Sequence, residues 1–123
     1  MANEISITAR ISASKAGTTA ANATSAFTLD MAGDQVNHTN PLVTTTAALL
    51  SLSPVDTTAR YHLFMRNQDV TNEVWVSFNG GTTFPVVILP GKSMGPITVA
   101  ASQTLWLDAQ VASCIVEVVA VEA

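Results

Sequence analysis

One stretch of the chain matches a known nucleophile motif. Gly91-Lys92-Ser93-Met94-Gly95 has the form G-x-S-x-G. In the hydrolases that use this motif, a strand turns sharply into a helix below the serine, and the histidine follows the serine in the chain. Here the strand-like run Pro96-Ile97-Thr98-Val99 follows instead, and both histidines, His38 and His62, precede the serine. We therefore expect a glycine-rich turn between two strands, no catalytic role for Ser93, and no enzyme.

Residues that commonly bind metals are scattered along the sequence. His38, His62 and Cys114 stand singly, without the short spacings of zinc sites. Asp30 and Asp34 flank one short loop, but they lack the alternating Asp/Asn pattern of a calcium loop. We expect no metal and no cofactor. Because Cys114 lies in the apolar run SCIVEVV, we also expect its thiol to be buried and unreactive.

Both tryptophans fall on the polar phase of their predicted strands. Trp75 lies in EVWVSF and Trp106 in TLWLDA, and each is out of phase with the valines or leucines beside it. Side chains alternate between the two faces of a strand. A sheet face or a loop could cover these rings, or they could stack on sugars. They could also form a subunit or partner contact, where tryptophan is enriched. Trp75 and Trp106 are therefore the candidate interface residues.

The elements that carry these residues read as strands. Residues 5–13 alternate cleanly between apolar and polar side chains, and Asn79-Gly80 predicts a tight hairpin turn with positive φ at both positions. We expect loops over 15–24 and 34–40, and a strand followed by a turn over 42–52. Further strands are predicted at 27–31, 61–67, 73–78, 82–89, 96–101, 104–110 and 113–121. This spacing predicts a single all-β domain over 1–123, an antiparallel β-sandwich or jelly-roll-like barrel.

Composition limits the partners of the chain. Only 11% of its 123 residues are charged, against a usual ~25%. A surface so poor in charge suits a protein partly covered by neighbours. The net charge of −4 makes nucleic acid and anionic membranes poor partners. The start MANEISITAR predicts no signal peptide, and no apolar window is long enough to span a membrane.

The stretch LFMRNQDVTNEVWVSFNGGTTFPVVILPGKS resembles a pattern in small structural proteins of tailed bacteriophages and prophages. In that pattern an apolar strand ends in Arg-Asn-x-Asp-x-Thr-Asn. A Val-x-Val strand, a glycine turn and a strand closed by Leu-x-Pro-Gly follow. The similarity covers most of the chain from Phe27 onward. The matching residues are Arg66-Asn67, Asp69, Thr71-Asn72, Val74-Trp75-Val76, Gly80-Gly81 and Leu89-Pro90-Gly91.

The resemblance implies a β-sandwich virion component without catalysis or cofactor. We expect a capsid decoration (cement) protein that docks in many copies on the shell. Its partners would be the major capsid protein or other virion proteins. The resemblance also favours a homo-oligomer, with a trimer first, and assembly into the virion in the cytoplasm of a bacterial host. The alternatives are a head–tail connection component and a receptor- or carbohydrate-binding module of a tail or fibre.

Overall fold

The computed structural model describes residues 4–13, 16–17, 21–31 and 33–123. By the contacts between its residues, the chain divides into two compact units, Met1–Ala32 and Gly33–Ala123. A single domain over 1–123 stays a prediction. The strands are β1 (Ile5–Ala13), β2 (Ala21–Leu29), β3 (Val36–Thr39), β4 (Leu42–Val43), β5 (Ala48–Leu49), β6 (Tyr61–Asn67), β7 (Val74–Ser77), β8 (Val86–Ile88), β9 (Ser93–Val99), β10 (Trp106–Ala109) and β11 (Cys114–Glu122).

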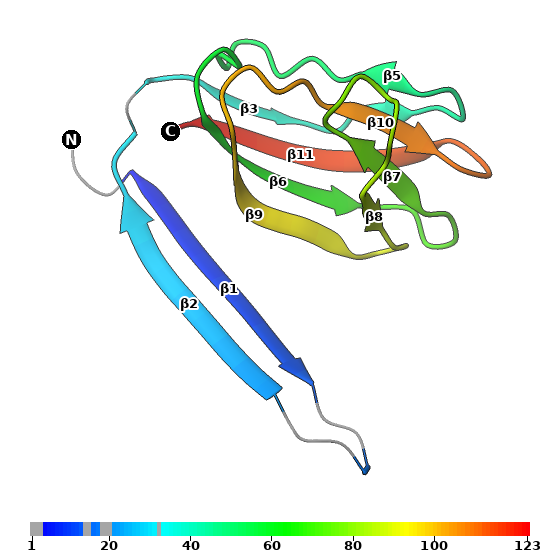
Figure 1. Ribbon diagram of the computed structural model, residues 1–123, viewed down its shortest axis with the longest axis horizontal. Coiled ribbons are helices and arrows are strands. Elements are labelled where there is room, and N and C mark those ends of the chain that lie inside the picture. The colour runs from blue at the N-terminus through cyan, green and yellow to red at the C-terminus, as the bar shows by residue number, and fades with distance from the viewer. Residues whose placement is uncertain (1–3, 14–15, 18–20, 32) are drawn as a thin grey trace. The chain divides into compact units, whose positions relative to one another are not determined.

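The first unit is a two-stranded hairpin (Figure 1). β1 and β2 pair antiparallel from Ile5 opposite Leu29 to Ala13 opposite Ala21, so the predicted strand over 5–13 is confirmed. The loop predicted over 15–24 is wrong for residues 21–24, because the ladder with β1 draws these small residues into β2. Residues 15 and 18–20 of that predicted loop lie outside the described residues.

The second unit contains two antiparallel sheets (Figure 1). One has the order β5-β10-β7-β8, and the other has the order β3-β11-β6-β9, with β4 also paired to β11. All described pairs are antiparallel, which confirms the all-β class with antiparallel sheets. The sheets of the described residues stay open and do not close into a barrel, so the barrel form of the prediction is wrong.

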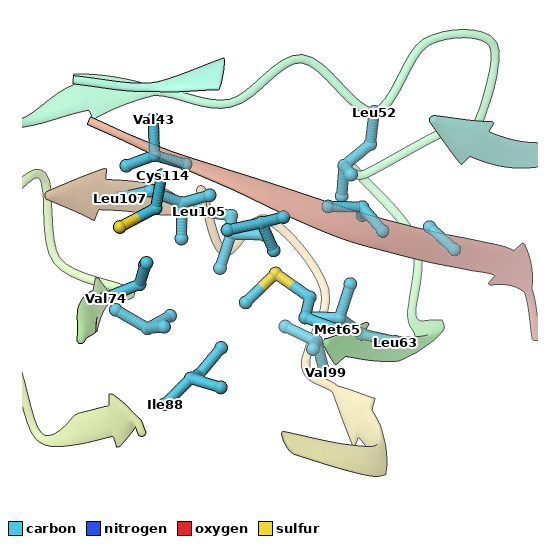
Figure 2. Packing of buried hydrophobic residues seen from close by; sticks show 14 of the residues in the cluster. Val43, Leu52, Leu63, Met65, Val74, Ile88, Val99, Leu105, Leu107 and Cys114 are labelled. Atoms are coloured by element: carbon cyan, nitrogen blue, oxygen red, sulfur yellow. The ribbon is translucent and has the colours of Figure 1, made fainter. Parts of the chain in front are cut away.

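A single apolar cluster draws side chains from both sheets of the second unit. Leu63 and Met65 come from β6, whereas Val74 comes from β7, and all three are at most 1% exposed. Figure 2 shows these side chains in the same cluster, with Cys114 and Leu107 close by. Burying one such side chain contributes about 1.5–3 kcal/mol, so this cluster is the main source of stability for the second unit.

The region before β6 differs from its prediction. Residues 36–39 were expected in a loop but form β3, because they pair with the long strand β11. Asn37 is buried in this strand, and its Nδ2 donates a hydrogen bond to the carbonyl of Ser53 at 2.8 Å. The single strand expected within 42–52 is replaced by β4 and β5, which have two residues each. In these segments pairing to a neighbour outweighs local propensity.

The connection between β7 and β8 is a loop over residues 78–85 instead of a two-residue turn. Gly80 and Gly81 have φ of 76° and 79°, so the need for glycine at 80 is confirmed, but Asn79 has no positive φ. The buried hydroxyl of Ser77 accepts hydrogen bonds from the amides of Asn79 (3.2 Å) and Gly81 (3.1 Å). Because this hydroxyl holds a wider loop together, the predicted tight turn is wrong.

Replacing Gly80 and Gly95 by alanine distinguishes two costs to stability. One is the strain of a positive φ, and the other is the clash of a new Cβ with a neighbouring backbone atom. Both glycines have positive φ (76° and 90°), but only at Gly95 would a Cβ meet a neighbouring backbone atom, the Leu63 carbonyl oxygen at 2.6 Å. We expect Gly80→Ala to lower the free energy of unfolding by about 1 kcal/mol, from the left-handed conformation alone. Gly95→Ala should cost about 2 kcal/mol or more. Urea unfolding measures both, and equal costs would contradict the close approach at Gly95.

Candidate interaction surface

The two tryptophans lie on the outward face of the sheet β5-β10-β7-β8. Val74 and Val76 of β7 point into the core and are 0% exposed, so Trp75 between them must lie on the opposite face. Leu107 of β10 is likewise buried, which places Trp106 on the outward face of its strand. The alternation predicted from the sequence is confirmed at both positions.

The strand register brings these rings onto one surface. Trp106 lies opposite Leu49 of β5, and Trp75 lies opposite Val87 of β8. Residues directly opposite in an antiparallel pair share a face, and β7 and β10 are neighbours. Leu49 and Val87 are 57% and 43% exposed, whereas both tryptophans are half-buried. We call Leu49, Trp75, Val87 and Trp106 the tryptophan face.

Local contacts hold both indole rings in place. Trp75 donates its indole N–H to Oε1 of Glu73 at 2.9 Å, and its ring packs against Phe84 with centroids 6.2 Å apart. Gly81 lies against the ring of Trp106, since a Cβ on Gly81 would be 3.3 Å from Cε3. A ring that is already positioned loses little conformational freedom when a partner binds. Phe84 was not among the candidate residues. The strand predicted over 82–89 is wrong for residues 82–85, so Phe84 lies in the loop before β8.

Asp108 brings a carboxylate onto the same face, opposite Trp75. Its Oδ2 accepts a hydrogen bond from Nε2 of Gln110 at 3.1 Å. Its Oδ1 is buried and has no hydrogen-bond partner among the described residues. An unpaired buried oxygen costs free energy, so this position is not optimised for stability alone.

The outward face of the other sheet combines apolar side chains, such as Phe64 and Val119, with one ion-paired cluster. Glu117 of β11 accepts a hydrogen bond from Nε2 of His38 at 3.0 Å and pairs with Nε of Arg66 at 3.2 Å. The hydrogen bond to His38 and the charge of Arg66 lower the pKa of the Glu117 carboxyl. Solvent-exposed ion pairs contribute little to stability. This cluster reads as a solvated surface and gives no reason to assign a site.

Ser93 lies on a strand and not in the predicted turn. The turn is complete one residue earlier, because the amide of Lys92 donates to the carbonyl of Leu89 at 3.0 Å. Ser93 then begins β9, where it is exposed and lies opposite Arg66. His38 bonds Glu117 and His62 bonds Thr98 (2.9 Å), so in the described part of the chain neither histidine bonds this serine.

The remaining candidate ligands do not converge. Cys114 is 1% exposed, as expected, and burial raises the pKa of its thiol, which disfavours the reactive thiolate. Within residues 4–13, 16–17, 21–31 and 33–123, no three His, Cys, Asp or Glu side chains gather as a metal site would require. The same residues contain no helix long and apolar enough to cross a membrane.

The Arg-Asn-x-Asp-x-Thr-Asn segment is a structural corner. Asn67 is 0% exposed, and its Nδ2 donates to the carbonyls of Asn72 (2.8 Å) and Ile88 (3.2 Å). Oδ2 of Asp69 accepts the amides of Thr71 (2.9 Å) and Asn72 (2.5 Å), and these bonds lower the pKa of Asp69. The most recognisable motif of the chain therefore ties β6 to the next corner and to β8.

The lowered pKa of Asp69 predicts how stability changes with pH. A carboxyl whose pKa is lower in the folded state stabilises the fold above its unfolded pKa, and this stabilisation is lost as the pH falls through the folded value. We expect Asp69→Asn to melt below wild type at pH 6. The gap should shrink as the pH falls below 3.8, the ordinary value for the group. Calorimetry from pH 6 to pH 2 checks this. A gap that stays constant would show that the charge of Asp69 has no part in the corner.

Comparisons of the chain with known proteins give no match that could assign a role to this surface. No family model, no curated protein and no solved structure matches the chain. The structural case for a role therefore rests on the geometry of the tryptophan face, and the resemblance to phage structural proteins stays a prediction.

Proposed function

We propose that this chain is a structural protein of a bacteriophage virion, a capsid decoration protein that docks in many copies on the shell. The observation that carries the proposal is the tryptophan face. It offers two half-buried, positioned rings flanked by the exposed side chains of Leu49 and Val87. Tryptophan at the centre of an interface often dominates the binding energy. Contiguous exposed apolar side chains often mark a surface that binds a partner.

The proposal also assigns a finer architecture and a set of partners. The second unit is a β-sandwich with a jelly-roll-like strand path, which is supported by the cluster that draws side chains from both sheets. The partners are the major capsid protein or other virion proteins. The chain is a homo-oligomer, with a trimer favoured by the resemblance. Its place is the virion, assembled in the host cytoplasm, and it needs no enzyme activity, cofactor, nucleic acid or membrane.

The low charge of the chain predicts the character of the docking contact. Five basic and nine acidic residues give a net charge of −4, and the tryptophan face carries no basic residue. At 0.1 M salt, interactions between exposed charges more than about 10 Å apart are largely screened, whereas apolar contacts depend little on this screening. Docking should therefore persist at high salt, unlike a contact formed between charged patches.

A sugar-binding module of a tail or fibre is the second candidate. One observation favours it: the Trp106 ring lies on the same face as the hydrogen-bonded pair Asp108 and Gln110. The indole N–H of Trp106 also has no partner among the described residues. Rings beside such polar groups suit the stacking and hydrogen bonding of a carbohydrate. The decoration role remains first, because Leu49 and Val87 extend the face with apolar side chains that a sugar would not use.

Binding to particles that lack this protein tests the proposal. We expect the wild type to saturate the shell in many copies per particle, and Trp75→Ala or Trp106→Ala to weaken binding about thirtyfold, the equivalent of ~2 kcal/mol. Phe64→Ala is a matched control, because Phe64 is also half-buried but lies on the outward side of β6, in the other sheet. Cosedimentation of labelled protein with particles gives copies and affinity.

The outcomes separate the alternatives. Wild type that binds no particle but saturates on host glycans would establish the sugar-binding module in place of the decoration role. Wild type that binds the shell with neither tryptophan substitution weakening it would remove the tryptophan face from the contact. Equal weakening by Phe64→Ala would show that the substitutions act through stability and not through a docked surface.

A further inference from the structure

The hairpin of the first unit has one apolar and one polar face. We call β1 and β2 together the arm. Because residues directly opposite share a face, the pairs Ile11–Ala23 and Ile7–Phe27 lie on one side, and Arg10–Thr24 lies on the other. Ile7 is only 8% exposed, whereas Ile11 is 72% exposed and Phe27 is 45% exposed, so the described residues leave the apolar side uncovered around Ile11 and Phe27. A two-stranded hairpin alone is marginally stable in water, so this arm needs a cover.

The exposed part of the apolar side has both a projecting side chain and a shallow hollow. A shallow, mainly apolar hollow lies over the middle of the arm, where Ala9, Ala23 and Ser25 leave space, with Arg10 and Thr24 also lining it. Ile11 also lines this hollow and is the most exposed large side chain of the arm. A projecting side chain next to a hollow of matching chemistry can engage an identical surface, each copy contributing both parts.

We propose that the cover is the arm of a second copy of this chain. Two arms stack face to face about a two-fold axis, and Ile11 of each copy enters the hollow over Ala9, Ala23 and Ser25 of the other. This contact is independent of the proposed function, because it requires no shell. It also differs from any trimer contact, since a two-fold contact joins copies in pairs.

The size of the arm sets the strength of this contact. Nine residues per strand at ~3.4 Å each, on two strands ~4.8 Å apart, give a footprint of about 300 Å² with side chains. Two stacked arms therefore bury about 600 Å² in total, below the ~1,200 Å² of stable interfaces. The pairing should be weak in dilute solution and become strong where other contacts already hold copies close together.

Disulfide trapping in the full-length chain tests the pairing. Purified Ala9→Cys and Ala23→Cys proteins are mixed and oxidised, and the mixed dimer is identified by mass spectrometry. Thr8→Cys mixed with Thr24→Cys is the matched control, because these positions have the same diagonal relation on the polar side. The native thiol of Cys114 is buried and should not contribute. We expect the apolar pair to cross-link at least tenfold faster than the polar pair.

A third substitution shows whether Ile11 provides the contact. Added to the apolar pair, Ile11→Asp should abolish the fast cross-linking, and Ile11→Val should keep it. Equal rates for the apolar and polar pairs would overturn the proposal, as would fast cross-linking that survives Ile11→Asp. Loss of cross-linking with Ile11→Val as well would also count against it, because valine keeps a projecting apolar side chain. No virion component is present, so these results do not depend on the decoration role.

Discussion

The alternation of buried and exposed side chains along β6, β7, β10 and β11 is the constraint on which the rest of the second unit depends. One face of each strand packs into the shared apolar cluster, so the remaining side chains of that strand must lie on the opposite, outward face. Val74, Val76 and Leu107 are at most 3% exposed, and their burial places Trp75 and Trp106 on the outward side. The surface proposed to dock is thus a direct consequence of how the core is built.

A second set of interactions joins the sheets at one corner. The buried amide of Asn67 at the end of β6 bonds the carbonyl of Ile88 in β8, which belongs to the other sheet. Asp69 orders the corner that follows. The corner residues on which the expected resemblance to phage proteins depends are therefore mostly residues that build the fold. The tryptophan face shares Trp75 and Val87 with the stretch that carries this resemblance, whereas Leu49 and Trp106 lie outside it.

Sequence patterns predicted the strands that alternate regularly and failed where a partner or a single side chain decides the geometry. The strand at 5–13, the phase of both tryptophans and the burial of Cys114 follow from local pattern. β3 forms because β11 offers an edge, which no local window contains. The wide loop after β7 depends on the buried hydroxyl of Ser77. Nothing in the spacing could show that Ile11 on the apolar side of the arm stays exposed.

A cryo-electron microscopy map of the virion tests the central claim most directly, because it shows which face of the domain meets its neighbour. The account predicts many copies of this chain on the particle surface. In each copy, the sheet β5-β10-β7-β8 should lie against a virion protein, with Trp75 and Trp106 buried at the contact. Copies that leave both rings facing solvent while another surface meets the particle would contradict the account.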